Sequence, residues 1–109
     1  MILIVVPPSI EGTVHETVEV AQNQTTYLSC PATGIPRPSI IWYRDDVPLF
    51  DAAADDQNVR QLDAARRLEL RQVRVDDDRV VYRCQANNVA GQTDKRFIVK
   101  VLGLSLIHI

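Results

Sequence analysis

Cys30 and Cys84 are the only cysteines in this 109-residue chain, and their surroundings decide which chemistry they can do. A thiol can act as a nucleophile, bind a metal or form a disulfide. A catalytic thiol lies exposed beside a base, whereas Cys84 alternates with apolar residues and has Arg83 next to it. A zinc site needs about four ligands, and the remaining candidates, His15 and His108, lie near opposite ends of the chain. We therefore predict no catalytic residue, no metal site and no other cofactor.

The interior of the chain alternates apolar and polar residues with a period of two, which is typical of strands with one buried face. This alternation occurs in TVEVA, TTYLSC, SIIWYR, RLELR, VVYRCQA and RFIVKV. Turn-forming stretches such as TGIPRP, RDDVP, VDDD and NNVAG separate these segments. Many short strands with regular turns predict an all-β, two-sheet antiparallel sandwich. Residues 51–68 are predicted to be a short connection, with a turn or two of helix as the alternative.

The two cysteines fall on predicted core faces. Cys30 ends one strand and Cys84 lies late in another, on the face that also carries Trp42. The three side chains meet in the core if the strands belong to facing sheets. A disulfide closing this loop of 55 residues, counted inclusively from 30 to 84, would restrict the unfolded chain by about 4 kcal/mol. A disulfide is favoured, and a buried free thiol and a reactive thiol are the alternatives.

Composition gives the chain the character of a single soluble domain. Apolar residues are 46% of the total, enough for one core, and charged residues are 24%. The formal charge of −2 gives no overall attraction to nucleic acid or to an anionic membrane, so we predict neither as a partner. The apolar stretches at the two ends are shorter than the roughly 20 residues that span a bilayer, which predicts no membrane insertion of this segment.

One series of residues runs through most of the chain with a distinctive order: Cys30, Trp42, Leu68-x-Leu70, Asp78-x-Val80-x-Tyr82-x-Cys84 and Ala86-x-Asn88-x-x-Gly91. From about Pro7 to Val101 the chain resembles an immunoglobulin domain of the intermediate, or I-set, kind. The resemblance implies an inter-sheet Cys30–Cys84 disulfide, with Trp42, Leu70 and Tyr82 in the core around it. It also implies that Tyr82 is a tyrosine corner, whose hydroxyl returns to the backbone of the preceding turn, and that Asp78 is the acidic residue of that turn.

The chain departs from the family pattern at two turns. Val80 stands where Gly or Ala is usual, and the stretch 73–78 is one residue longer, so we expect a crowded or bulged corner before Tyr82. Asp46 stands where a turn glycine is common. Because Asp tolerates left-handed backbone better than most residues, the hairpin is expected to survive.

The resemblance also implies a domain organisation. The stretch ILIVVPPSI resembles the end of one repeat passing through a Pro-Pro link, so residues 1–6 are assigned to a preceding repeat, a linker or the first strand. Residues 7–101 form the I-set domain, and residues 102–109 are a tail outside it without functional meaning. The implied function is a structural and adhesive repeat of a larger matrix or cell-adhesion protein that contacts neighbouring immunoglobulin domains and other extracellular proteins. The alternatives are a ligand-binding domain of a neural cell-surface receptor and an intracellular sarcomeric spacer.

Two features favour an extracellular location. A disulfide needs an oxidising compartment to form. Asn23-Gln24-Thr25 is an acceptor pattern for N-glycosylation just before a predicted strand.

Charged clusters suggest one further partner. Arginines gather in the predicted fifth and sixth strands, and a candidate basic patch for heparan-type polysaccharide consists of Arg67, Arg71, Arg74 and Arg83. The alternative is a solvated face balanced by the acidic run 76–78. The aspartates of the chain lack the spacing of a calcium-binding loop, which predicts no calcium site.

Overall fold

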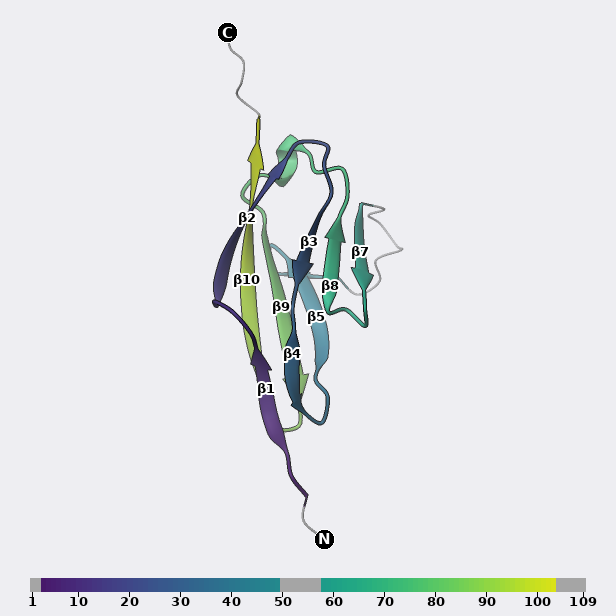
Figure 1. Ribbon diagram of the computed structural model, residues 1–109, viewed down its shortest axis with the longest axis vertical. Helices are drawn as coiled ribbons and strands as arrows, with labels where there is room; N and C mark the ends of the chain where they lie inside the picture. Colours follow the sequence, from purple (N-terminus) through teal and green to yellow (C-terminus); the bar gives the residue numbers. More distant parts are fainter. Residues whose placement is uncertain (1–2, 50–57, 104–109) are drawn as a thin grey trace.

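The computed structural model describes residues 3–49 and 58–103 as an elongated arrangement of strands (Figure 1). A short 3-10 turn, η1, lies at one pole. In chain order the elements are β1 (Val6–Ile10), β2 (His15–Ala21), β3 (Thr26–Ser29), β4 (Ala32–Ile35), β5 (Ser39–Arg44), β6 (Val47–Pro48), β7 (Val59–Leu62), β8 (Arg67–Leu70), η1 (Val75–Asp77), β9 (Val81–Asn88) and β10 (Gly91–Leu102).

The strands form two facing layers. One layer is a five-stranded sheet in the order β2-β10-β9-β5-β6, and the other is the three-stranded sheet β3-β8-β7 followed by the pair β1-β4. Neighbouring strands are antiparallel except β2 and β10, which run parallel from the His15–Arg96 pair to the Ala21–Leu102 pair. The predicted all-β, two-sheet antiparallel sandwich is therefore confirmed.

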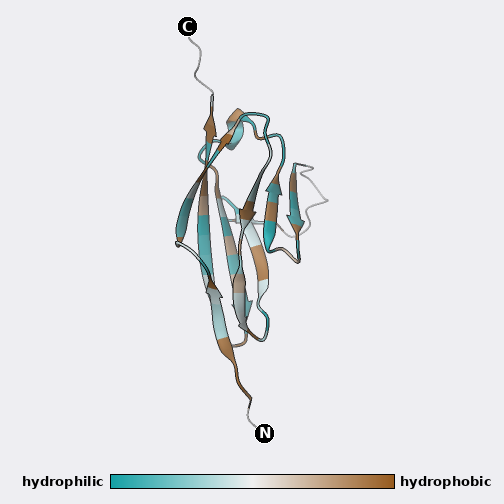
Figure 2. Ribbon diagram, in the orientation of Figure 1, coloured by the Kyte–Doolittle hydropathy of each residue, from teal (hydrophilic) through white to brown (hydrophobic). Residues whose placement is uncertain are grey.

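The core lies between the layers and follows the predicted alternation of side chains. Figure 2 shows hydrophilic and hydrophobic residues alternating along several strands. Burying a large apolar side chain contributes about 1.5–3 kcal/mol, so these strand faces are the main source of stability. The buried side chains on the predicted faces are Val20, Leu28, Ile40, Trp42, Leu68, Leu70, Val80, Tyr82, Ala86, Phe97, Val99 and Val101.

The chain changes its strand partner at Cys30, which lies between β3 and β4. β3 pairs with β8, whereas β4 pairs with β1. Between them lies Pro31, which has no N–H to offer a ladder. Instead, the Cys30 carbonyl oxygen accepts a hydrogen bond of 2.9 Å from Ala32 N–H, and Cys30 N–H donates one of 2.8 Å to Arg66 O. The interruption divides one long strand between two partners.

Part of the region 51–68 differs from the predicted connection. Residues 50–57 lie outside the described residues, but 59–62 form β7 and pair with β8. Asp63, Ala64 and Ala65 then turn the chain with φ values of 53°, 56° and 68°. The helical alternative is absent from residues 58–70.

Both unusual turns behave as the sequence predicts. Asp45 and Asp46 take the left-handed conformation, with φ values of 47° and 69°, so the hairpin between β5 and β6 forms without glycine. At the corner before β9, Arg79 is also left-handed, and its N–H bonds to Val99 O at 2.7 Å. Val99 N–H bonds in turn to Val80 O at 3.0 Å, so two residues of the corner face one residue of β10. This is the expected bulge.

The domain ends can be compared with the predicted boundaries. β1 begins at Val6, within the stretch assigned to a linker or first strand, and β10 continues to Leu102. Positions 1–2 and most of the predicted tail, 104–109, lie outside the described residues. Within the described ranges, no helix is long and apolar enough to cross a membrane.

Candidate functional site

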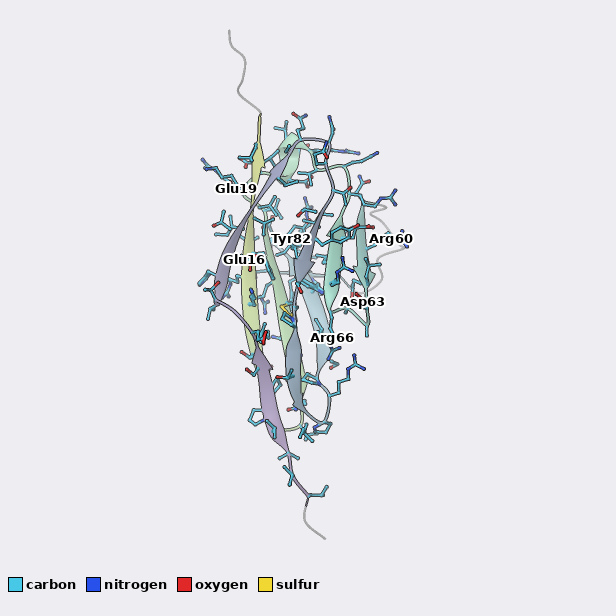
Figure 3. All side chains as sticks on the ribbon, in the orientation of Figure 1. Glu16, Glu19, Arg60, Asp63, Arg66 and Tyr82 are labelled. Carbon is cyan, nitrogen blue, oxygen red and sulfur yellow. A yellow bond between two sulfur atoms is a disulfide. The ribbon has the colours of Figure 1, made fainter. Side chains whose placement is uncertain are left out.

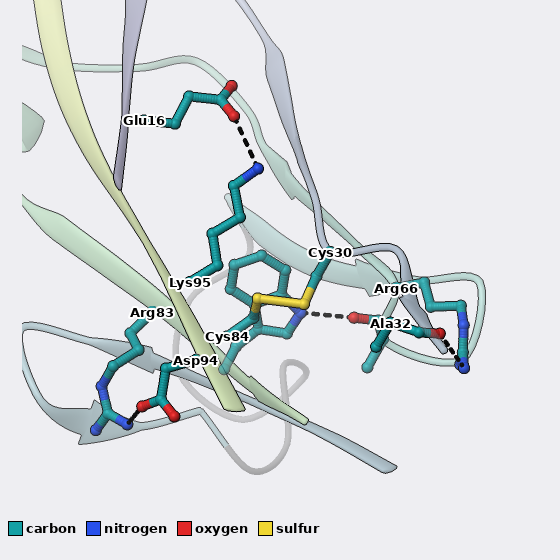
Figure 4. Close-up of a disulfide and its surroundings, with 10 residues drawn as sticks. Glu16, Cys30, Ala32, Arg66, Arg83, Cys84, Asp94 and Lys95 are labelled. Carbon is teal, nitrogen blue, oxygen red and sulfur yellow. Dashed lines mark hydrogen bonds and ion pairs between the residues drawn. A yellow bond between two sulfur atoms is a disulfide. The ribbon is translucent and has the colours of Figure 1, made fainter. Parts of the chain in front are cut away.

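The centre of the sandwich is a disulfide between its two sheets (Figure 4). Cys30 follows β3 and Cys84 lies on β9, with Cα atoms 6.5 Å apart and both side chains fully buried. The predicted inter-sheet disulfide is therefore present, and neither thiol is free. A buried sulfur bonded in this way cannot act as a nucleophile.

Trp42 lies beside the disulfide and is also fully buried. It pairs in register with Cys84 across β5 and β9, and its ring packs against Phe97 with centroids 5.6 Å apart. Its indole N–H donates a bond of 2.6 Å to Ala65 O in the turn between β7 and β8. Trp42 thus connects the five-stranded sheet to a turn of the opposite sheet.

Lys95 is a charged residue at an inward-facing position of β10. Its ammonium lies 3.1 Å from Glu16 Oε1 (Figure 4). It also lies 5.2 Å from the centroid of the Phe97 ring. Gly12 comes close as well, because a Cβ at this position would lie 3.0 Å from Lys95 Nζ. The ion pair therefore fills the space beside the passage from β1 to β2.

The corner before β9 holds a chain of polar contacts. The Tyr82 hydroxyl, in an almost fully buried side chain, accepts a bond of 3.2 Å from Arg44 Nε, and Arg44 also pairs with Asp77 at 3.2 Å. Partial burial disfavours the charged guanidinium, but Tyr82 and the carboxylates of Asp77 and Asp45 outweigh that effect and raise the pKa of Arg44. The arrangement fixes η1 against β5.

Asp78 and Leu70 take positions that support this corner. The Asp78 carboxylate accepts a bond of 2.9 Å from Val101 N–H, which joins the corner to β10. Leu70 is buried in the core. The tyrosine-corner bond from Tyr82 to the backbone of the turn stays a prediction.

A hollow of about 560 Å³ opens next to this corner. Its lining combines cations and anions, so its charges largely cancel. The residues around it include Arg44, Arg71, Arg74, Asp76, Asp77 and Tyr82.

The four arginines of the candidate basic patch do not form one surface. Arg67 pairs with Asp63 at 3.4 Å and lies over the Tyr27 ring on the three-stranded sheet. Arg83 lies on β9 of the other sheet. Only Arg71 and Arg74 share the hollow described above. Figure 3 shows Arg60, Asp63 and Arg66 on the side of β7 and β8, opposite Glu16 and Glu19.

Arg83 is part of an ordered group on the outer face of the five-stranded sheet. It lies 3.9 Å from the centroid of the Tyr43 ring, pairs with Asp94 at 2.8 Å and reaches Asp46 at 3.8 Å. Tyr43 in turn bonds to Gln85 at 3.4 Å. This group combines a half-buried aromatic side chain with a charge held in one orientation.

Asn88 organises the pole where β1 enters, a role that sequence reasoning missed. Its amide nitrogen donates to Val6 O at 2.8 Å and to Pro36 O at 2.9 Å, and its carbonyl oxygen accepts from Ala90 N–H at 2.8 Å. Gly34 leaves room for this side chain, because a Cβ there would lie 3.1 Å from Asn88 Nδ2. The motif ANNVAG, which contains Asn88, is the part of the sequence that could have indicated this role.

Asn23 lies in the turn between β2 and β3 with an exposed side chain. His15 is exposed at the start of β2 and lines a shallow hollow with Asp45, Asp46 and Arg96. Over residues 3–49 and 58–103, no three His, Cys, Asp or Glu side chains are grouped so that they could hold a metal ion.

Comparisons with known proteins agree with this arrangement. The sequence pattern of the immunoglobulin I-set domain matches residues 8–101. Mouse Hemicentin-1 is 39% identical over 93 residues, which cover 84% of this chain and 2% of that protein. Rat Neural cell adhesion molecule 1 is 31% identical over 103 residues, or 92% of this chain and 12% of that protein. The chain therefore spans a small fraction of these relatives.

Solved structures confirm the fold. Titin domain M7 superposes with a TM-score of 0.75 at 20% identity, covering 93% of this chain and 99% of that one. At this identity the likeness concerns the fold alone. The resemblance to hemicentin repeats, which the motifs VPPSI, GIPRPSIIWYRDDVPL and ANNVAG predict, is confirmed by the sequence comparison.

Proposed function

This chain belongs to the immunoglobulin I-set family, and on that premise we propose that it is an extracellular structural and adhesive module. It acts as one repeat of a larger matrix or cell-adhesion protein and presents rigid surfaces to neighbouring immunoglobulin domains and other extracellular proteins. The proposal assigns it no catalytic role. The similarity to Hemicentin-1 and to Neural cell adhesion molecule 1 supports this assignment.

The observation that carries the proposal is the Cys30–Cys84 disulfide. Disulfides form and persist in oxidising compartments, whereas cytosolic thiols are kept reduced. Closing this long loop contributes about 4 kcal/mol, a large share of the roughly 5–15 kcal/mol that holds a small domain together. A fold that depends on such a bond is suited to the extracellular space.

The positions of β1 and β10 support a role as a repeat. Figure 1 shows β1 entering at one pole and β10 leaving at the opposite pole. Domains joined through opposite poles line up as a rod, and Pro7 and Pro8 in β1 stiffen the entry. A rod of this kind spans distance and offers its sides to partners.

The first experiment tests the disulfide and the location. The chain is secreted from eukaryotic cells, and its intact mass is measured with and without reduction and alkylation. We expect no alkylation before reduction and alkylation of both cysteines after it. Secretion failure, or free thiols in the secreted protein, would contradict the proposal and favour the intracellular spacer.

A second experiment tests the rod. Tandem fusions of increasing copy number are measured by small-angle X-ray scattering. The maximum dimension should grow by about 40 Å per copy, since the 12 residues of β10 rise about 3.3 Å each. Compact particles whose length does not grow with copy number would argue against a spanning role.

A ligand-binding domain of a cell-surface receptor is the second candidate, because Tyr43 and Arg83 form an ordered group on an outer sheet face. Beads coated with the secreted domain are mixed with cultured cells to measure adhesion. Loss of adhesion in Tyr43→Ala but not in Tyr27→Ala would favour the receptor. Tyr27 is a matched control because it also lies beneath an arginine, on the opposite sheet.

A further inference from the structure

The turn between β2 and β3 holds its backbone firmly. Gln24 N–H bonds to Ala21 O at 3.1 Å, and Asn23 N–H bonds to Val73 O at 2.7 Å. Val73 N–H returns a bond of 3.0 Å to Gln24 O. Asn23 takes a left-handed φ of 70°, which asparagine tolerates better than most residues. The backbone is therefore fixed while the Asn23 side chain stays in solvent.

Asn23 differs from the other asparagines of the chain in its side-chain contacts. Asn88 uses its amide in three bonds, Asn87 bonds to Gln85, and Asn58 also interacts with another residue. The Asn23 carboxamide makes no hydrogen bond to any residue of 3–49 or 58–103. Of these four asparagines it alone is followed by the x-Thr pattern of a glycan acceptor.

Thr25, the second element of the acceptor pattern, is accessible too. It is exposed, and its hydroxyl makes no bond within the described part of the chain. Neither polar group of the pattern has to be released from the fold before an enzyme can reach it.

We propose that Asn23 carries an N-linked glycan. The inference rests on the proposed function, because the transfer takes place in the secretory pathway. The donor is a lipid diphosphate-linked oligosaccharide. Asn23 Nδ2 attacks the sugar C1, so that an N–C bond forms and the C–O bond to the diphosphate breaks. The amide loses one proton, and the lipid diphosphate leaves with the bonding electron pair.

The glycan would stand at the pole where β10 ends. Gln22, next to Asn23, donates its N–H to Leu102 O at 3.4 Å, and Val73 precedes η1 by two residues. Val75 of η1 is a half-exposed apolar residue at this pole. A hydrated oligosaccharide here would screen that apolar surface and restrict the directions from which a following domain can pack against it.

The test uses the chain secreted from eukaryotic cells, with intact masses measured before and after peptide N-glycosidase treatment. The unmodified sequence and Thr25→Ser should carry an oligosaccharide that the enzyme removes, leaving aspartate at position 23. Asn23→Gln and Thr25→Ala should show the bare polypeptide mass. Asn87→Gln is the matched control and should keep the glycan, because residue 87 lacks the acceptor pattern.

Disulfide status separates the two possible failures. A secreted, disulfide-bonded chain with the bare polypeptide mass would overturn the glycan while leaving the proposed function standing. Glycan that persists in Asn23→Gln would overturn the assignment of this residue. A chain with free thiols and no glycan would overturn the proposed function, and the inference with it.

Discussion

Lys95 and Glu16 form an ion pair of 3.1 Å whose members differ sharply in exposure, the lysine side chain being 7% exposed and the glutamate 47%. The lysine is held within the sandwich, whereas the glutamate lies at the edge of the sheet on β2. Removing one charge or the other therefore has unequal consequences.

We expect Glu16→Ala to lower the free energy of unfolding by about 1–2 kcal/mol, because it leaves the Lys95 charge buried without its partner. Lys95→Met should stay within about 1 kcal/mol of the original, since methionine fills similar space and Glu16 can be hydrated. Urea unfolding measures both. Glu19→Ala, on the same strand and exposed, is the control. Equal losses in the two variants would contradict the asymmetry.

The bond from Trp42 to Ala65 predicts a cost for losing the indole N–H. Trp42→Phe should lower the free energy of unfolding by about 2 kcal/mol or more, since it leaves a gap in the core and an unpaired carbonyl. Chemical unfolding followed by far-UV circular dichroism measures this loss. Tyr43→Phe, which removes a hydroxyl with one long bond of 3.4 Å to Gln85, should change it by less than about 0.5 kcal/mol. If Trp42→Phe lowered the free energy of unfolding by no more than Tyr43→Phe does, the bond to Ala65 would contribute little.

The left-handed turn at Asp63, Ala64 and Ala65 predicts a stabilising substitution. Ala64 has a φ of 56°, where a Cβ is unfavourable, so Ala64→Gly should raise the free energy of unfolding by about 0.5–1 kcal/mol. The same change at Ala21, an exposed strand residue, should lower it by about 0.5–1 kcal/mol. Thermal unfolding compares the two. A decrease at both positions would mean that the turn does not strain Ala64.

Asn88 predicts a local effect at the pole where β1 enters. Asn88→Asp keeps an acceptor for Ala90 N–H but sets a carboxylate oxygen against the carbonyls of Val6 and Pro36. Hydrogen exchange should become faster in the β1–β4 pair, with the β9–β10 ladder unaffected. Asn87→Asp is the matched control, since Asn87 makes one long bond of 3.4 Å. Equal exchange in both variants would contradict the role of Asn88.

Much of the fold could be predicted because its main signal is local. The alternation around Trp42, Tyr82 and Phe97 places each strand's inner face without knowledge of its neighbours. Predicting the disulfide required only the two cysteines and the family pattern. Left-handed turns at aspartates were also predictable, because that residue type favours them.

The features that the sequence did not predict depend on contacts between distant segments. Lys95 lies in phase with Phe97, but its burial requires Glu16 from a strand far away in the sequence. Arg67 and Arg83 belong to one arginine-rich stretch of the sequence, yet β8 and β9, which carry them, lie in opposite sheets. Ala64 carries no signal of a left-handed turn, because alanine ordinarily favours helix.

The parallel pairing of β2 with β10 has a mechanical consequence. If a chain of such domains is stretched, tension pulls β2 toward one pole and β10 toward the other, along the strand axes. The ladder from the His15–Arg96 pair to the Ala21–Leu102 pair is then loaded in shear, and its bonds share the force instead of opening one after another. Once it yields, the covalent link between residues 30 and 84 keeps the intervening chain from extending. The domain would then lengthen only by the chain outside that loop and stop.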